Sequence, residues 1–261
     1  FHAFSIIIPT GRLEPTSHKY NTETMKRLMF FLVVMTVITI LSSCELPNPQ
    51  APETPSVEDS EINVNKHEYV DLGLSVKWAT CNIGAKEPWE NGDYFAWGET
   101  KSKEEYTWYT YKWCYRNSKS ITKYCNNEKY GIVDYKAVLD REDDAAIVNW
   151  GENWRIPTAV ECAELRKNCT WTWTFKNGVG GYEIASNKTG YTNRCIFLPA
   201  AGWKFSSTLD EEGERGLYWS NLLDTDSPEW SYALQFRSGG YKGVDSDHSR
   251  ACGMPIRPVC P

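Results

Sequence analysis

Short stretches in which apolar and polar residues alternate recur through the C-terminal two-thirds of the chain. Residues 69–79 alternate in this way, which is the period of a β-strand or a tight hairpin. The apolar residues 94–98 predict another short strand, whereas 101–130 show no clear period and are expected to form loop. Further short strands are expected at 171–175, 182–185, 195–198, 217–219, 232–236 and 254–259.

Two helices are predicted between these groups of strands. Two aspartates precede the apolar residues 145–150, and acids at a helix start interact favourably with the helix dipole. Thr158 and Glu161 have the spacing of a capping box, Pro157 blocks helix upstream, and this second helix is expected to end near Asn168. Short strands, two helices and many loops indicate a single α+β domain over residues 66–261.

The N-terminal part has a different pattern. Residues 1–24 show no periodicity and are expected to be an upstream extension outside the fold. Residues 25–43 combine a basic start with an apolar run too short to span a bilayer, which is typical of a signal peptide. The run ends in Leu-Ser-Ser before Cys44, which resembles a bacterial lipobox. We therefore expect lipid on Cys44 and a lipid-anchored protein at the outer membrane or cell surface.

Residues 44–65 are rich in proline and acidic or polar residues, so they are expected to form an extended tether. Without residues 1–43 the chain loses four basic and two acidic residues, leaving 24 Lys and Arg against 32 Asp and Glu. This acidic balance repels phosphate backbones and anionic lipids. We therefore expect no nucleic-acid partner, and membrane attachment only through the lipid.

Cysteine content agrees with export. Eight of the nine cysteines lie after Cys44, and an even number in an oxidising compartment indicates disulfides. Cys114 and Cys125 could bridge a hairpin, although several of these residues could equally be buried thiols. No pair has the C-x-x-C spacing of a zinc or redox site.

Seven segments occur in order across almost the whole domain: 69–85, 92–100, 143–146, 154–158 (Trp-Arg-Ile-Pro-Thr), 197–202, 218–220 and 256–259. Together they resemble the Fibrobacter succinogenes major paralogous domain family. The resemblance implies a C-type-lectin-like fold close to the sulfatase-modifying-factor branch, in a secreted or surface protein. It implies no particular activity. Proteins with this fold usually bind ligands near the C-terminal end, here residues 219–250.

Within that segment, residues 230–237 alternate, so one face is expected to pack inward and the other to meet solvent. Trp230 is favoured as a core residue over a contact residue. Aromatic, amide and carboxylate side chains around it suit a sugar or an adaptable protein contact. The candidate ligand-binding residues are Asn221, Asp224, Trp230, Tyr241, Asp245, Asp247 and His248.

Metal and catalytic interpretations have weaker support. Aspartates at 224, 226, 245 and 247 could offer oxygens to calcium, but the Glu-Pro-Asn and Gln-Pro-Asp motifs of sugar-binding C-type lectins are missing. No zinc motif, nucleophile elbow or phosphate-binding glycine loop occurs. Adjacent Asp143 and Asp144 favour helix capping over a catalytic pair. We therefore expect no metal, no cofactor and no enzyme activity.

The leading hypothesis is a surface-displayed protein that binds a glycan or protein ligand through its C-terminal loops and strands. Three alternatives stay open: a structural or adhesin-like envelope component, an enzyme on a sulfatase-modifying-factor-like scaffold, and a receptor diversified by a retroelement. Fold-level analogy alone does not choose between them.

Overall fold

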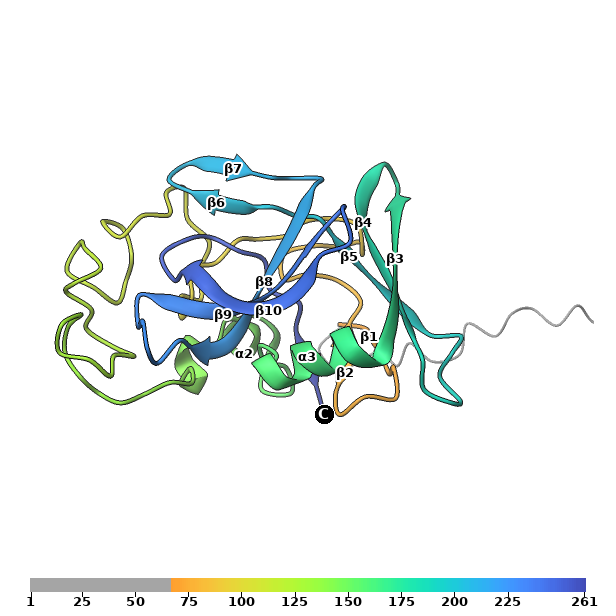
Figure 1. The fold of residues 1–261 in the computed structure, drawn as a ribbon, viewed down its shortest axis with the longest axis horizontal. Helices are drawn as coiled ribbons and strands as arrows, with labels where there is room; N and C mark the ends of the chain where they lie inside the picture. Colours follow the sequence, from red (N-terminus) through yellow and green to blue (C-terminus); the bar gives the residue numbers. More distant parts are fainter. Residues whose placement is uncertain (1–66) are drawn as a thin grey trace, which may run out of the picture. The chain divides into compact units, whose positions relative to one another are not determined.

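The structure is a computed structural model that describes residues 67–261 (Figure 1). The expected extension, signal peptide and tether, together with Cys44, lie outside the described residues. No helix in the described part is long and apolar enough to cross a bilayer. The described part contains small antiparallel sheets, two α-helices and long loops, so the predicted α+β class is confirmed.

The beginning and the end of the described chain pair in one sheet. β1 (Tyr69–Val70) and β11 (Val259–Cys260) flank β2 (Lys77–Ala79), and both pairings are antiparallel. The hairpin predicted at 69–79 is therefore confirmed. The strand predicted at 254–259 is shorter than expected, because prolines within it have no N–H to donate to a ladder.

A second sheet contains β3 (Cys169–Lys176), β4 (Val179–Ser186) and β5 (Cys195–Pro199) in sequence order. All three were predicted at these places. The strand predicted at 94–98 is wrong, since this segment makes only one bridge, between Phe95 and Met254, and then turns at Gly98 with φ 75°.

The third sheet has the order β10–β9–β8, with β8 (Arg215–Leu223), β9 (Trp230–Arg237) and β10 (Lys242–Ser249). Strand β10 was not predicted. Helix α3 (Ala159–Asn168) contacts all three strands and lies along this sheet in Figure 1. A separate hairpin of β6 (Trp203–Phe205) and β7 (Thr208–Asp210), also not predicted, lies on the other side of the sheet (Figure 1).

Both helices begin as the sequence predicts. Asp144 caps α2 (Ala145–Trp150) by accepting hydrogen bonds from the backbone of Ala146 and Ile147. The Thr158 hydroxyl accepts from Glu161 N at 3.1 Å, and the Glu161 carboxylate accepts from Thr158 N at 2.9 Å, which completes the capping box. A short 3₁₀ turn, η1 (Arg141–Asp143), precedes α2.

Both faces of the β8–β9–β10 sheet are covered. Tyr218 and Leu234 belong to one apolar cluster, whereas their neighbours Trp219 and Ala233 belong to another. The expectation that one face of residues 230–237 meets solvent is therefore wrong, because Ser231, Ala233 and Gln235 are buried as well. The reason is that a second apolar cluster packs on the face of the sheet that was expected to meet solvent.

The described cysteines are all free thiols. The disulfides expected from their even number, including the Cys114–Cys125 bridge, are therefore not formed in this structure. Most of the eight are buried and behave as small apolar residues, which was the other interpretation open from the sequence.

The long loop region 101–130 is held by a buried arginine. Arg250 is fully buried, and its guanidinium donates to the carbonyls of Lys123, Tyr124 and Pro228 and to the Tyr111 hydroxyl at 2.7–3.0 Å. These bonds satisfy backbone oxygens that have no sheet partner. They fasten the loops to the strand that ends at Ser249.

Candidate functional site

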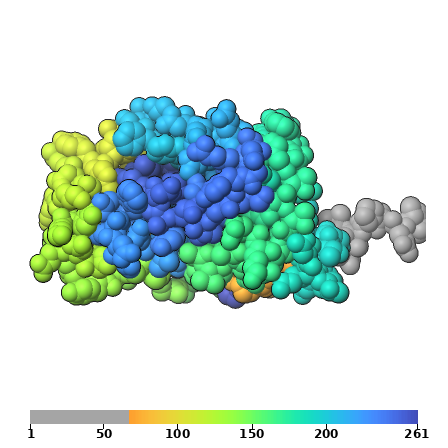
Figure 2. Space-filling view, viewed as in Figure 1, coloured from red at the N-terminus to blue at the C-terminus, as the bar shows by residue number. Residues whose placement is uncertain are grey.

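A surface hollow of about 380 Å³ lies between the β6–β7 hairpin and the ends of β9 and β10. We call it the β6/β10 hollow. Figure 2 shows the surface recessed between the light-blue hairpin and the darker blue of β10. It is lined by Trp203, Phe205, Arg215, Trp230, Asp247, His248, Ser249, Cys252 and Met254.

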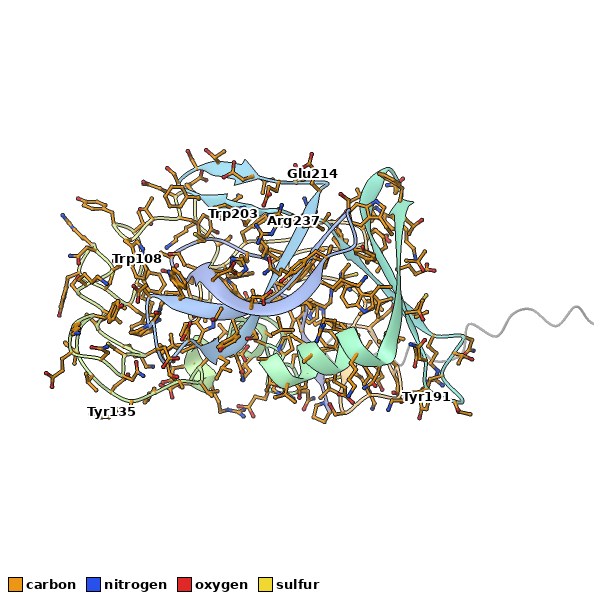
Figure 3. The ribbon with its side chains drawn as sticks, in the orientation of Figure 1. Trp108, Tyr135, Tyr191, Trp203, Glu214 and Arg237 are labelled. Atoms are coloured by element: carbon orange, nitrogen blue, oxygen red, sulfur yellow. The ribbon has the colours of Figure 1, made fainter. Side chains whose placement is uncertain are left out.

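Three aromatic side chains form its walls. Trp203 and Phe205 are two residues apart on β6, and their ring centres lie 6.3 Å from each other. Figure 3 places Trp203 beneath the hairpin, toward β10. Phe205 is 51% exposed and Trp230 is 42% exposed. The expectation that Trp230 is a core residue is therefore wrong, and its ring is open to a ligand.

The pairing of β6 with the C-terminal segment builds the floor. Lys204 N donates to Gly253 O at 2.7 Å, and Gly253 N donates back to Lys204 O at 2.9 Å. The side chains on either side of Gly253 belong to Cys252 and Met254, and both are almost completely buried. The hollow thus has an apolar floor beneath aromatic walls.

The positive charge of Arg215 is paired inside the protein. Its guanidinium donates to Glu211 Oε2 at 2.9 Å and to the side-chain oxygen of Gln235. Arg237 lies 3.4 Å from the other oxygen of Glu211. Burial favours the neutral form of Glu211, but the hydrogen bond and charge of Arg215 outweigh it and lower the pKa of the carboxyl group.

Asp247 and His248 bring a carboxylate and an imidazole to the rim. His248 is 8% exposed, and burial lowers its pKa to about 4 although Asp247 lies nearby, so the ring is neutral at pH 7. His248 Nε2 lies 3.0 Å from Asp247 Oδ1, without the angle of a good hydrogen bond. The Asp247 side chain is 61% exposed and can accept hydrogen bonds from a ligand.

Buried polar atoms without a hydrogen-bond partner gather around this hollow. Among the described residues nine such side-chain atoms occur, and three belong to the lining: Trp203 Nε1, Arg215 Nε and His248 Nε2. Two more, on Glu229 and Ser231, flank Trp230. These atoms are covered by the protein itself, so they mark a polar layer beneath the hollow and not groups that a ligand in the hollow contacts.

No match is found for this chain among protein-family models, characterised proteins or solved structures.

The structure brings three of the seven predicted residues, Trp230, Asp247 and His248, to the hollow. Tyr241 and Asp245 lie outside its lining and bond to each other. The Tyr241 hydroxyl and Gln235 Nε2 each donate to Asp245 Oδ2 at 2.6 Å. These two predicted residues therefore belong to a polar network on the sheet.

Asp224 and Asn221 also lie outside the lining of the hollow. Asp224 accepts from the backbone of Asp226 and Ser227 and from the Ser246 hydroxyl, so its oxygens stabilise a turn. Asn221 pairs through its backbone with the Pro157 carbonyl, close to the helices. The hollow therefore does not bring these two residues together with Asp247, and their role in ligand binding stays a prediction.

Carboxylates converge in one place within residues 67–261, at Asp140, Glu142 and Asp143. A cation already lies there, because Lys123 Nζ is 2.6 Å from an oxygen of Asp140 and of Asp143 and 3.7 Å from Glu142. Asp143 is buried and is held further by Tyr124. This cluster is therefore an internal ion-pair network.

A larger hollow of about 540 Å³ lies at the start of the described chain, beside His67, Cys81 and Lys86. Its aromatic residue is Trp150, whose face is stacked on His67 with ring centres 3.8 Å apart. Because this aromatic surface is already covered, the hollow offers less to a ligand than the β6/β10 hollow.

Sequence reasoning missed Trp203, Phe205 and Arg215. The first two have the i, i+2 spacing of aromatic residues on one side of a strand, which is a usable signal. The hairpin turn that follows them contains no glycine or asparagine, the residues that usually mark such turns. Ser206 takes the positive φ of 55° instead.

Proposed function

We propose that the protein is a lipid-anchored envelope protein whose domain binds a glycan in the β6/β10 hollow. The observation that carries this proposal is the exposed pair of Phe205 and Trp230 beside the exposed carboxylate of Asp247. Aromatic rings offer an apolar surface to the face of a sugar ring, while nearby polar groups meet its hydroxyls.

The lipid on Cys44, a location at the outer membrane or cell surface, and a C-type-lectin-like fold are parts of the same proposal. They are supported by the lipobox-like sequence and by the resemblance of the domain to the major paralogous domain family.

A cysteine nucleophile fits the hollow less well than a binding role. Cys252 is the thiol in its lining, and burial raises the pKa of this thiol to about 11. A thiol with this pKa is almost entirely protonated at neutral pH, so it is a weak nucleophile. This favours binding over a sulfatase-modifying-factor-like reaction at this site.

A protein partner is the second candidate, and one observation favours it. The loops that precede η1 carry exposed aromatic residues, with Tyr109 62%, Tyr115 70% and Tyr135 81% exposed. Figure 3 shows Tyr135 at the edge of these loops. Exposed tyrosines are common in protein interfaces. This surface is distinct from the hollow, so the two candidates can be separated by substitutions.

The test is binding of the purified full-length chain, in detergent, to an array of neutral, acetylated and charged glycans. We expect binding that falls at least tenfold in Trp230→Ala and in Phe205→Ala. The matched control is Phe175→Ala, which removes another exposed aromatic ring, 66% exposed, from β3. Lack of glycan binding, or equal binding by all variants, would refute the proposal.

A further inference from the structure

Strand β3 is an open edge of its sheet. The strand order is β3–β4–β5, so β3 pairs with β4 on one side and with no described strand on the other. In Figure 1, β3 rises from the end of helix α3. An open edge presents backbone N–H and C=O groups that another chain can pair with.

The turn between β3 and β4 decides which backbone groups point to this edge. Asn177 and Gly178 have positive φ angles of 49° and 82°, as in a two-residue type I′ turn. Such a turn makes Lys176 and Val179, which lie opposite each other, a hydrogen-bonded pair. Because these pairs alternate along an antiparallel ladder, the odd-numbered residues 171–175 turn their backbone groups away from β4.

The hydrogen bonds of β4 agree with this alternation. Gly180 lies opposite Phe175, and its carbonyl accepts from Ala200 N at 2.8 Å, on the side away from β3. Within residues 67–261, no backbone group of the odd-numbered residues 171–175 bonds to another loop or strand end. Their N–H and C=O groups are therefore available at the edge.

None of the usual protections of an edge strand is present in β3. Its register with β4 is continuous, without a bulge, and the strand contains no proline. The single charge in the strand is that of Lys176, and its Nζ lies 2.9 Å from Glu183. Thr172 is exposed, and Phe175 is 66% exposed. Since proteins normally blunt an edge with charge, proline or a bulge, an unprotected edge indicates a partner.

The sequence of the strand indicates which partner fits. Residues 170–174 read Thr-Trp-Thr-Trp-Thr in either direction. An antiparallel second copy, related by a two-fold axis through Thr172, is therefore in register with the first. It places Thr170 opposite Thr174. It also places Trp171 opposite Trp173, the residues whose backbone groups face the edge. Aromatic–aromatic and threonine–threonine pairs both stabilise neighbouring strands.

The two tryptophans are already held in place by their own domain. The ring centres of Trp171 and Trp173 lie 5.5 Å and 5.1 Å from that of Tyr182, at near-perpendicular angles of 67° and 82°. Both residues remain partly exposed. A second copy thus meets side chains that need little further ordering, which lowers the entropic cost of association.

We infer that β3 is a dimerisation strand, through which one copy of this chain joins its three-stranded sheet to that of a second copy. The contact is isologous, so it closes at two copies and uses up both β3 edges. No residue of β3 lines the β6/β10 hollow, so the inference goes beyond the proposed glycan-binding function and does not depend on it.

The experiment measures the mass of the purified full-length chain in detergent by sedimentation equilibrium over a range of concentrations. We expect a monomer–dimer equilibrium for the wild type. Thr172→Lys brings two ammonium groups together at the axis, so the dissociation constant of the dimer should rise by about tenfold. The matched control is Thr208→Lys, which adds the same charge to an exposed threonine of β7 and should leave the dissociation constant unchanged.

A charge exchange makes the test specific for β3. Thr172→Glu alone should weaken the dimer as Thr172→Lys does, because like charges again meet at the axis. An equimolar mixture of the two variants should recover the dimer, and this recovery also shows that both variants are folded. A monomeric wild type, a dimer undiminished in Thr172→Lys, equal weakening in Thr208→Lys, or no recovery in the mixture would each overturn the inference.

Discussion

Replacing Arg250 by methionine tests whether one buried cation fastens the loop region to the rest of the domain. The guanidinium makes four hydrogen bonds of 2.7–3.0 Å, three of them to backbone carbonyls, and Trp97 and Tyr111 lie against its faces. Methionine fills a similar space without any donor, so the carbonyls of Lys123, Tyr124 and Pro228 lose this partner.

The expected loss of unfolding free energy follows from the hydrogen bonds that Arg250→Met removes. A buried acceptor left without a donor costs about 1–3 kcal/mol, which for three carbonyls gives a gross loss of roughly 3–9 kcal/mol. The variant no longer has to desolvate a guanidinium, and this gain offsets part of the loss. We therefore expect the free energy of unfolding to fall by about 3–5 kcal/mol in Arg250→Met.

The assay is denaturant unfolding followed by tryptophan fluorescence, with Arg141→Met as the matched control. Arg141 is 64% exposed and pairs at 3.2 Å with Glu152, which is 84% exposed, so its loss should cost about 0–1 kcal/mol. Limited proteolysis should also cut residues 101–130 faster in Arg250→Met. A free energy of unfolding for Arg250→Met within 1 kcal/mol of that of Arg141→Met would refute the reasoning. In that case the hydrogen bonds of Arg250 would do no more than offset the cost of desolvating its guanidinium.

Three further predictions concern the helices and the acidic cluster. Thr158→Ala should lower the free energy of unfolding, measured by urea denaturation, by about 1 kcal/mol, and Thr158→Ser should lower it by less, because only alanine removes the cap oxygen. Equal losses in the two variants would contradict this. Burial raises the pKa of Glu161, but Arg155 lowers it more, so its folded pKa lies below the ordinary 4.5. Its contribution is therefore present above that value and lost as pH falls through the folded pKa. Glu161→Gln should cost more stability at pH 7 than in acid, and a cost that does not change as the pH is lowered would refute this. Calcium should leave the Tm of the wild-type protein unchanged and raise that of Lys123→Ala, because the ammonium lies between Asp140 and Asp143; a calcium-dependent Tm in the wild type would contradict this.

The helices could be predicted from the sequence because their signals are local. The capping box needs only Thr158 and Glu161, three residues apart, and the Asp144 cap needs only the next two or three backbone N–H groups. No distant residue is required to decide either helix start. Strands β3, β4 and β5 were predicted for a similar reason, since turn residues separate apolar segments of strand length.

Strand β10 could not be predicted because its own residues do not favour a strand. Residues 242–249 contain glycine and two aspartates, which are depleted in strands. Pairing with β9 holds them extended, from Lys242 opposite Phe236 to Ser249 opposite Trp230, with an irregularity between Asp245 and His248. This is a tertiary effect, and it also decides which of the acids reach the hollow.

The free cysteines show a similar limit to what the sequence alone can predict. An even number of cysteines after a signal peptide is compatible with disulfides and with buried thiols, and spacing alone does not distinguish the two. In the structure Cys162 and Cys169 are buried on or beside α3, and burial raises the pKa of each thiol. Their role is to fill the core.

Composition directs attention to the segment of the chain that borders the hollow, but it does not separate the residues that reach the hollow from those that do not. Asp224 and Asp245 attract interest because carboxylates bind ligands well, yet the same oxygens bind the nearest donors of the protein itself, a turn backbone in one case and Tyr241 in the other. Alternation assigns Trp230 to the core, yet it lies where β9 begins and is 42% exposed. A polar residue becomes available to a ligand when the fold leaves it without a partner, and an apolar residue when the fold leaves it uncovered. Both conditions depend on contacts between distant strands, and in the described chain they coincide where β6, β9 and β10 meet.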